Sequence, residues 1–401
     1  MPTTSSHKPK FSTLQIIVLI ATVALSAIST DLYLSGFMDM TRSFATTESQ
    51  VQLTLTFFML GFAGGQIISG PLSDHYGRLP ILKLSIIFYI AASIACFLVA
   101  SIEMMWLARL IQGLAAAAGP VLGRAMIADL YERQEAASFM SHIASAMAIV
   151  PALAPIVGSI LLHWFAWQSH FIALSIFGIT LLLAVHFMMF ETAPSKGGHA
   201  LTKIKSLFGS SFSFLKHKQF LGYVILASCA FGSMFAYISV ASYLVTDALG
   251  IDKTYFGYTF AFNVFGLFLA ASINARIIKH IRIERILGVA MGILFSIGTI
   301  FLIFQFDYLS LPLLLACMFF VFGVGGMTMS NTQAAAISLF RAQAGSASAI
   351  FGLIQTGSAA LTGTLAGYFY AGTALPLAII IGFCGTLGLL TWWICFSDSN
   401  R

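Results

Sequence analysis

Long apolar runs separated by short polar segments make up most of the chain. Runs of about 20 residues, the length that crosses the hydrocarbon core of a bilayer as a helix, occur at 14–37, 51–72, 80–101, 104–128, 136–162, 169–190, 219–246, 255–275, 285–304, 310–338, 345–370 and 374–396. The pattern predicts an all-α polytopic membrane protein with twelve transmembrane helices. The first run is too long for the apolar core of a signal peptide, so we expect it to be an uncleaved span.

One long polar connection, residues 191–218, divides these runs six from six. We therefore expect an N-terminal six-helix bundle at 1–190, a linker at 191–218 and a C-terminal six-helix bundle at 219–401. The halves also show an internal similarity, because "LYERQEAAS" from Leu130 follows the fourth run and "LFRAQAGSA" from Leu339 follows the tenth. This favours two pseudo-symmetric bundles with a site between them.

Composition and charge narrow the class further. The chain is 59% hydrophobic and 8% charged, against the ~25% charged residues of soluble domains. Its net charge of +6 comes from scattered basic residues, which favours a lipid bilayer over nucleic acid as the partner. All but Arg42, Lys253 and Arg109 of the 20 Lys and Arg residues lie on one side if the N-terminus is cytoplasmic, so both termini are expected there.

The reactive residue types show no catalytic or metal-binding pattern. The five cysteines all fall inside apolar runs without metal-ligand spacing, and we interpret them as small buried hydrophobes. We find no nucleophile and base set and no nucleotide-binding loop. An enzyme is therefore not expected, and no metal or organic cofactor is predicted.

Asp31 is the one acidic residue that falls well inside a run. It lies about 25 Å along a helix that starts at Leu14, and Arg109 enters the fourth run from the outer side to a similar depth. A lone charge inside a span costs at least ~2.5–3.5 kcal/mol, so we expect both side chains to face a shared polar cavity. Two alternatives remain open: a purely structural ion pair, and an Asp31 that caps the outer end of its helix in water.

A buried carboxyl group can act as a proton carrier. Burial favours its neutral form, whereas a nearby guanidinium favours its charged form. Movement of Arg109 or entry of a substrate could therefore change the protonation of Asp31. We predict that Asp31 and Arg109 couple transport to protons, with the proton as the coupling ion.

Three motifs carry a family resemblance. "GPLSDHYGRLP" from Gly70 resembles the loop signature of the major facilitator superfamily between spans two and three, "RLIQGLAAAAGP" resembles its span-four motif, and "PALAPIVGS" its antiporter motif in span five. With "TDLYLSGF" in span one, the whole chain resembles the Bcr/CflA branch of drug:proton antiporters. It departs from that pattern at His75, Leu79 and Ser159, and at Ser35 and Gly36, where prolines are usual.

The loop motif predicts a cytoplasmic gate. From the residues alone, Gly70 and Gly77 allow tight turns and close helix approach, and a solvated turn is the alternative. The resemblance implies more: Arg78 pairs with Asp129, and Asp74 faces the start of span eleven near Gly345 and Ser346.

The span-five motif consists of Pro151, Pro155 and Gly158. These residues could be packing features only. The resemblance implies a bend against span eight that blocks proton leak.

A substrate cavity is expected between the halves. Aromatic residues offer an adaptable apolar lining, and amides offer hydrogen bonds either to a substrate or to a neighbouring helix. The candidates are Tyr33, Phe58, Gln112, Phe231, Phe235, Tyr237 and Asn263. His142 is a further titratable group at the start of span five, either an interfacial histidine or a second proton carrier.

These features together favour a proton-coupled secondary transporter that exports small amphipathic molecules, such as drugs or a metabolite like a siderophore, by alternating access. A proton-coupled importer of nutrients with the same fold is the alternative. We expect a monomer in the bacterial inner membrane.

Overall fold

The computed structural model describes residues 10–131, 133–193, 214–304, 309–340 and 344–397. Within these ranges, the side chains of 133–134, 136–138, 140–142, 144–146, 148 and 344–346 are outside the description.

The first half of the chain is helical from residue 13 onward. Its elements are α1 (Thr13–Asp31), the 3₁₀ turn η1 (Leu34–Gly36), α2 (Phe37–Ser43), α3 (Glu48–Tyr76), α4 (Arg78–Leu98), α5 (Ile102–Ala116), α6 (Ala118–Leu130), α7 (Arg133–Trp164) and α8 (Ser169–Met188). The first predicted span is thus broken after Asp31, and the fourth is divided between α5 and α6.

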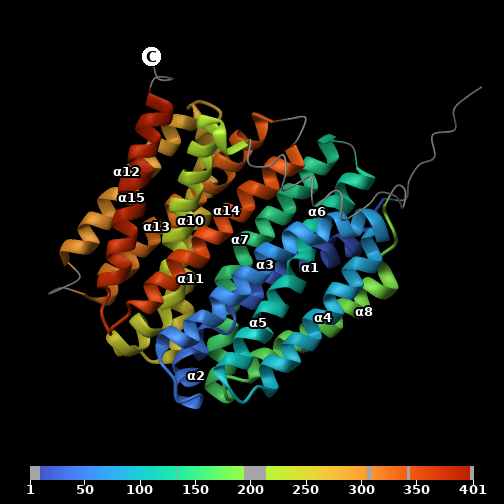
Figure 1. The fold of residues 1–401 in the computed structure, drawn as a ribbon, viewed down its shortest axis with the longest axis horizontal. Coiled ribbons are helices and arrows are strands. Elements are labelled where there is room, and N and C mark those ends of the chain that lie inside the picture. Colours follow the sequence, from blue (N-terminus) through green and yellow to red (C-terminus); the bar gives the residue numbers. More distant parts are fainter. Residues whose placement is uncertain (1–9, 132, 194–213, 305–308, 341–343, 398–401) are drawn as a thin grey trace, which may run out of the picture.

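The second half repeats this plan. It comprises η2 (Phe214–Lys216), α10 (Lys218–Tyr243), the π-helical turn η3 (Leu244–Ala248), η4 (Lys253–Tyr255), α11 (Phe256–Ile277), α12 (Ile283–Phe304), α13 (Leu311–Ser338), α14 (Ala344–Tyr368) and α15 (Leu375–Phe396). Figure 1 shows α10 and α12–α15 on one side of the molecule and α1–α6 and α8 on the other, with α7 and α11 between them. The two similar segments found in the sequence fall at equivalent points, because α6 ends at Leu130 and Leu339 caps α13.

The helices match the predicted spans in number and length. Eleven helical segments in the described part of the chain are long and apolar enough to cross a membrane. The remaining predicted span, 136–162, corresponds to α7, in which Ile149–Trp164 is an apolar helical stretch of described residues.

The outer surface of the bundle is apolar. Large side chains such as Leu98, Phe187 and Trp393 are more than three-fifths exposed, which is unfavourable in water but suits contact with lipid. Four of the five cysteines are buried and Cys395 is half-buried, as the sequence predicts. The chain is therefore a multi-pass membrane protein.

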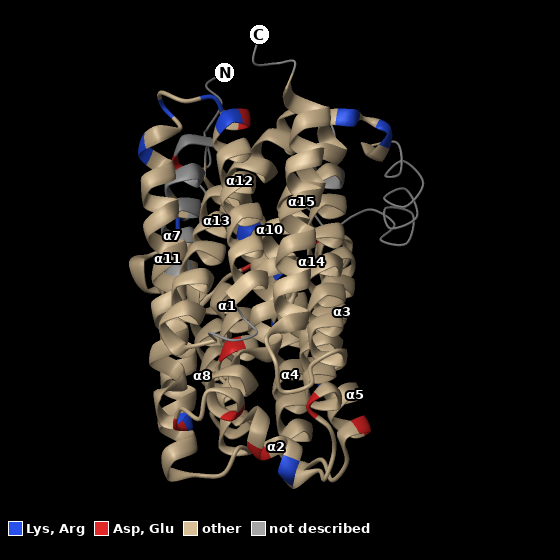
Figure 2. Ribbon diagram, turned by 90° about the vertical axis from the view of Figure 1, so that its left-hand side faces the viewer, with Lys and Arg blue, Asp and Glu red and all other residues tan. Residues whose placement is uncertain are grey.

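The charged residues are separated between the two ends of the bundle. Figure 2 shows Lys and Arg gathered at the end where α15 finishes, and few of them at the end where α2 lies. We refer to these as the linker end and the α2 end.

The two halves are joined at the α2 end. Lys253 of η4 forms an ion pair with Asp39 of α2, with 2.7 Å between Nζ and Oδ2. The hydroxyl groups of Thr41 and Tyr243 lie 2.9 Å apart. These contacts close the α2 end between segments that are some 200 residues apart in the sequence.

Candidate transport site

Asp31 is the last residue of α1, at the point where the first span breaks. Its side chain is 5% exposed, and its Oδ1 accepts a hydrogen bond of 2.9 Å from the Thr30 hydroxyl. No ion pair to Asp31 is found in the described part of the chain. A carboxyl group that is buried with one neutral hydrogen-bond donor has little to stabilise its charged form.

Arg109 of α5 lies at the depth expected from the sequence. Its guanidinium donates a hydrogen bond of 3.1 Å to the carbonyl oxygen of Ser29, two residues before Asp31, and a second to Gln112. Its Cζ also lies 4.2 Å from the ring centroid of Tyr33 and 4.4 Å from that of Phe58. Arg109 is fully buried, and its Nε has no hydrogen-bond partner among the described residues.

The structural ion pair between Asp31 and Arg109, one of the alternatives left open by the sequence, is therefore wrong for this state. Helix α1 presents a backbone carbonyl oxygen to the guanidinium, and the aromatic rings hold the cation by their negative faces. Asp31 is also buried, so the alternative in which it caps a helix end in water is wrong as well.

A short polar network surrounds this cation. The amide of Gln112 donates a hydrogen bond of 2.7 Å to Ser93, and the hydroxyl groups of Ser29 and Tyr89 lie 2.6 Å apart. All these residues belong to the first half, on α1, α4 and α5. The network fixes Gln112 beside Arg109.

The motif segment of α7 packs directly on the broken end of α1. A β-carbon built on Gly158 would lie 1.9 Å from the carbonyl oxygen of Leu32, the residue after Asp31. Only a glycine permits this approach. The motif therefore contacts the backbone beside the candidate proton carrier.

The same segment also contacts the second half. A β-carbon on Gly257 of α11, the eighth span, would lie 2.6 Å from the carbonyl oxygen of Pro155. Ser159, which departs from the family pattern, is buried, and its hydroxyl accepts a 3.0 Å hydrogen bond from the amide of Gly257. The predicted contact between the motif and span eight is confirmed. Its effect on proton leak stays a prediction.

His170 of α8 contacts both the motif segment of α7 and the chain that follows the break after Asp31. Its imidazole is fully buried, and its Nε2 lies 2.9 Å from the carbonyl oxygen of Gly158 and 3.4 Å from the Ser35 hydroxyl. Its Nδ1 has no hydrogen-bond partner among the described residues. His142, the histidine singled out from the sequence, has a side chain that lies outside the described residues.

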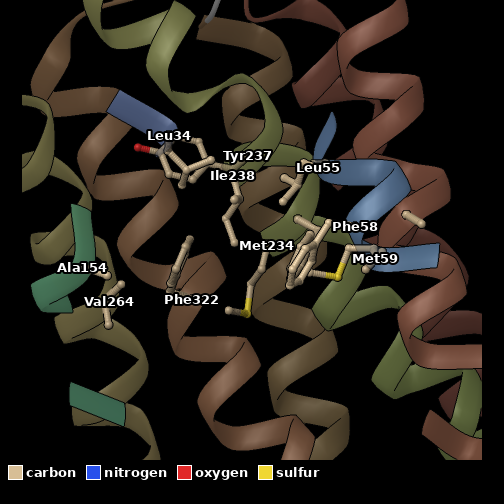
Figure 3. Packing of buried hydrophobic residues seen from close by; sticks show 14 of the residues in the cluster. Leu34, Leu55, Phe58, Met59, Ala154, Met234, Tyr237, Ile238, Val264 and Phe322 are labelled. Atoms are coloured by element: carbon tan, nitrogen blue, oxygen red, sulfur yellow. The ribbon is translucent and has the colours of Figure 1, made fainter. Parts of the chain in front are cut away.

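The predicted cavity residues form two groups instead of one. Tyr33, Phe58 and Gln112 surround Arg109. In the second half, the Asn263 amide donates a 2.9 Å hydrogen bond to the Tyr237 hydroxyl. The ring centroids of Phe231 and Phe235 lie 4.7 Å apart. Figure 3 shows Phe58 and Tyr237 in the buried apolar cluster, where the Tyr237 ring lies near Phe322 of α13.

The predicted gate loop is mostly helix. Helix α3 continues to Tyr76 and α4 starts at Arg78, so Gly77 alone connects them, with φ of 101°. The Arg78 guanidinium lies 2.6 Å from Asp74 and 3.1 Å from Asp129. The pairing of Arg78 with Asp129 is confirmed. The predicted position of Asp74 near Gly345 and Ser346 stays a prediction, because the surroundings of these two residues lie outside the description.

Gly70 does not have the role predicted for it. It lies within α3, and a β-carbon there would be 3.9 Å from its nearest neighbour, Val121, which is an ordinary contact. Close helix approach therefore does not require a glycine at this position.

Glu191, at the start of the linker, contacts the connection between α3 and α4, although it lies over 100 residues away in the sequence. Its carboxylate accepts hydrogen bonds from the backbone amides of Arg78 at 2.9 Å and Leu79 at 3.2 Å. It thereby caps the N-terminus of α4, where a negative charge is stabilising.

Sequence reasoning missed Glu191, His170 and Tyr89. Each makes the contact described above through the fold, with a residue that is distant in the sequence. The one available signal was chemical: a histidine and a glutamate at the ends of apolar runs need partners.

Comparison with known proteins identifies the family of this chain. The family model described as Major Facilitator Superfamily matches residues 19–364. A bicyclomycin resistance protein homolog of Haemophilus influenzae is 29% identical over 92% of this chain and 93% of its own length. A chloramphenicol resistance protein of Pseudomonas aeruginosa is 28% identical over 68% of this chain and 64% of its own length. A multidrug resistance protein MdtL of Shewanella is 25% identical over 82% and 83% of the two chains.

Solved structures show the same fold. A POT family transporter in complex with a thioalcohol-conjugated peptide aligns with a TM-score of 0.75, at 11% identity, over 96% of both chains. The xylose transporter XylE of E. coli, in a partially occluded inward-open conformation, aligns with a TM-score of 0.67, at 17% identity, over 96% of this chain and 98% of its own. Because the family model matches residues 19–364, most of its length, the chain belongs to the major facilitator superfamily.

Proposed function

We propose that this transporter is a proton-coupled antiporter that exports small amphipathic molecules, with Asp31 as the coupling carboxylate. The observation that carries the proposal is the position of Asp31. It is buried at the break of the first span, between the backbone contact of Arg109 and the motif segment of α7. Relatives named for resistance to bicyclomycin, to chloramphenicol and to several drugs support the substrate class.

The mechanism needs one change of charge. A proton that reaches Asp31 makes the carboxyl group neutral and removes the cost of burying its charge. A deprotonated Asp31 needs water or a cation, so it favours a state in which the break opens or Arg109 moves closer. Substrate that occupies the space between the halves competes with that movement, which makes the exchange of proton for substrate obligatory.

The orientation follows from charge. We place the linker end, where most Lys and Arg residues lie, in the cytoplasm of a bacterial cell, with both termini on that side. The α2 end, closed by Asp39 and Lys253, then faces outward. We also expect the monomer to be the transporting unit, because the two halves of one chain already meet at the motif segment, where α7 contacts α11.

The test measures export by purified protein in proteoliposomes. Chloramphenicol is the first probe, and a pH gradient drives its movement. Asp31→Asn keeps the shape of the side chain and removes its charge, so proton-driven transport should fall to the level of empty vesicles. Glu103→Gln, which changes an exposed acidic residue on α5, should transport like the wild type.

Full proton-driven transport by the Asp31→Asn protein would refute the role of this residue. If the probe moves across the membrane in the same direction as the protons, instead of in the opposite direction, the result would favour the importer.

A further inference from the structure

The first span of this chain lacks the residues that would make its break rigid. Ser35 and Gly36 follow Asp31 closely, at positions where the resemblance predicts prolines. A proline restricts its own φ and the conformation of the residue before it. A serine and a glycine do neither, and Gly36 adds conformational freedom. Other contacts must therefore hold the break in place.

His170 lies against these two residues. Its Nε2 is 3.4 Å from the Ser35 hydroxyl. A β-carbon built on Gly36 would lie 3.1 Å from Cε1 and 3.3 Å from Nδ1 of the same ring. The missing side chain at Gly36 thus leaves the space that the imidazole fills.

The ring is also bonded to the motif segment of α7. A carbonyl oxygen only accepts hydrogen bonds, so the 2.9 Å contact requires that Nε2 donates its hydrogen to Gly158. Gly158 in turn packs on the carbonyl oxygen of Leu32, next to Asp31. One imidazole therefore joins α8, the break of the first span and the motif segment.

We propose that His170 is a positioning residue that locks the break after Asp31 to the motif segment of α7 and so prevents protons from crossing without substrate. The inference rests on the proposed role of Asp31 as the proton carrier. It assigns to His170 the rigidity that prolines would supply. His170 itself does not carry the transported proton.

The experiment measures proton leak and needs no substrate. Purified protein is reconstituted in vesicles that contain potassium and a pH-sensitive dye, and valinomycin imposes a negative interior. In the wild type, the interior should acidify little faster than in empty vesicles. His170→Leu keeps a similar volume and loses the hydrogen bond. Its leak should rise about threefold to tenfold, the range that the loss of one hydrogen bond gives.

Two further variants identify the cause. His170→Gln retains an N–H donor that can reach Gly158, so its leak should be close to that of the wild type. The double variant Asp31→Asn with His170→Leu should be tight again, because the carrier of the leaking proton is gone. His186→Leu, an exposed histidine on the same helix, is the matched control and should not leak.

Several results would overturn the proposal. A tight His170→Leu protein would do so, as would a leak of equal size in His170→Gln, or a leak that persists in the double variant. If His170→Leu does not fold, Gly36→Ala takes its place, since its methyl group would press on the imidazole and on the β-carbon of Trp167 and should raise the leak. A wild type that exchanges no protons for chloramphenicol or another tested drug would count against the proposed function, whereas the leak comparison would still decide the role of His170.

Discussion

Arg109 shows how this protein keeps a cation in an apolar interior. The guanidinium is stacked between Tyr33 and Phe58 and bonded to a backbone carbonyl oxygen and an amide. Such a site uses the planar shape of arginine as well as its charge. A neutral, protonated Asp31 can therefore exist near Arg109 without breaking an ion pair.

Arg109→Lys tests this interpretation. Lysine keeps the charge but loses the flat face and two of the five N–H donors, so thermal unfolding should occur at a lower temperature, by an amount that corresponds to roughly 1–2 kcal/mol. The reaction of the buried cysteines with a thiol-specific dye reports unfolding. Arg124→Lys, at an exposed arginine of α6, is the control. Equal midpoints for the two variants would show that stacking does not stabilise Arg109.

At the scale of elements, two glycines of the same motif have different roles. Gly77 connects α3 to α4 with φ of 101° and ψ of 154°, a conformation that is almost restricted to glycine. A β-carbon there would also lie 2.4 Å from the carboxylate of Glu191. Gly70 is helical and has space around it.

Gly77→Ala should therefore destabilise the protein by about 1–3 kcal/mol, whereas Gly70→Ala should be neutral or stabilising by up to about 1 kcal/mol. The buried cysteines again report thermal unfolding, and transport of chloramphenicol shows whether the gate still works. A Gly70→Ala protein that is as unstable as Gly77→Ala would contradict the assignment of the two glycines.

At the scale of the whole molecule, the contacts described above join the two halves at the α2 end. The Asp39–Lys253 pair is partly exposed, so it contributes little on its own, about 0–1 kcal/mol. The buried contacts of Ser159 with Gly257 and of Thr41 with Tyr243 must therefore supply more of the closure. A weakly held end is what alternating access requires, since the same contacts have to open in each cycle.

The orientation of the molecule is tested by thiol labelling in intact cells. A membrane-impermeant maleimide added outside should label Lys253→Cys, because this position is about half exposed at the α2 end. It should label Lys203→Cys, in the linker, only after the membrane is permeabilised. Most native cysteines are buried, which keeps the background low. Labelling of position 203 in intact cells would reverse the proposed orientation.

Much of the fold could be predicted from the sequence because the bilayer simplifies the problem. A span must be a helix of about 20 apolar residues, since backbone groups have no other partners in lipid. Hydrophobic length alone therefore located the helices, and the scarcity of charge in the spans identified Asp31 and Arg109. The pairing of Arg78 with Asp129 came from the family motif.

The tertiary structure decided how these residues are used. Whether Arg109 meets a carboxylate or a carbonyl oxygen depends on how α1 and α5 are rotated about their axes. Both helices carry apolar residues on all sides, so the sequence pattern does not specify this rotation. The contacts of His170 with Gly158 and of Glu191 with Arg78 join residues 12 and 113 positions apart. They exist only because packing brings these helices together, so the sequence determined which segments span the membrane and the fold determined which of their residues meet.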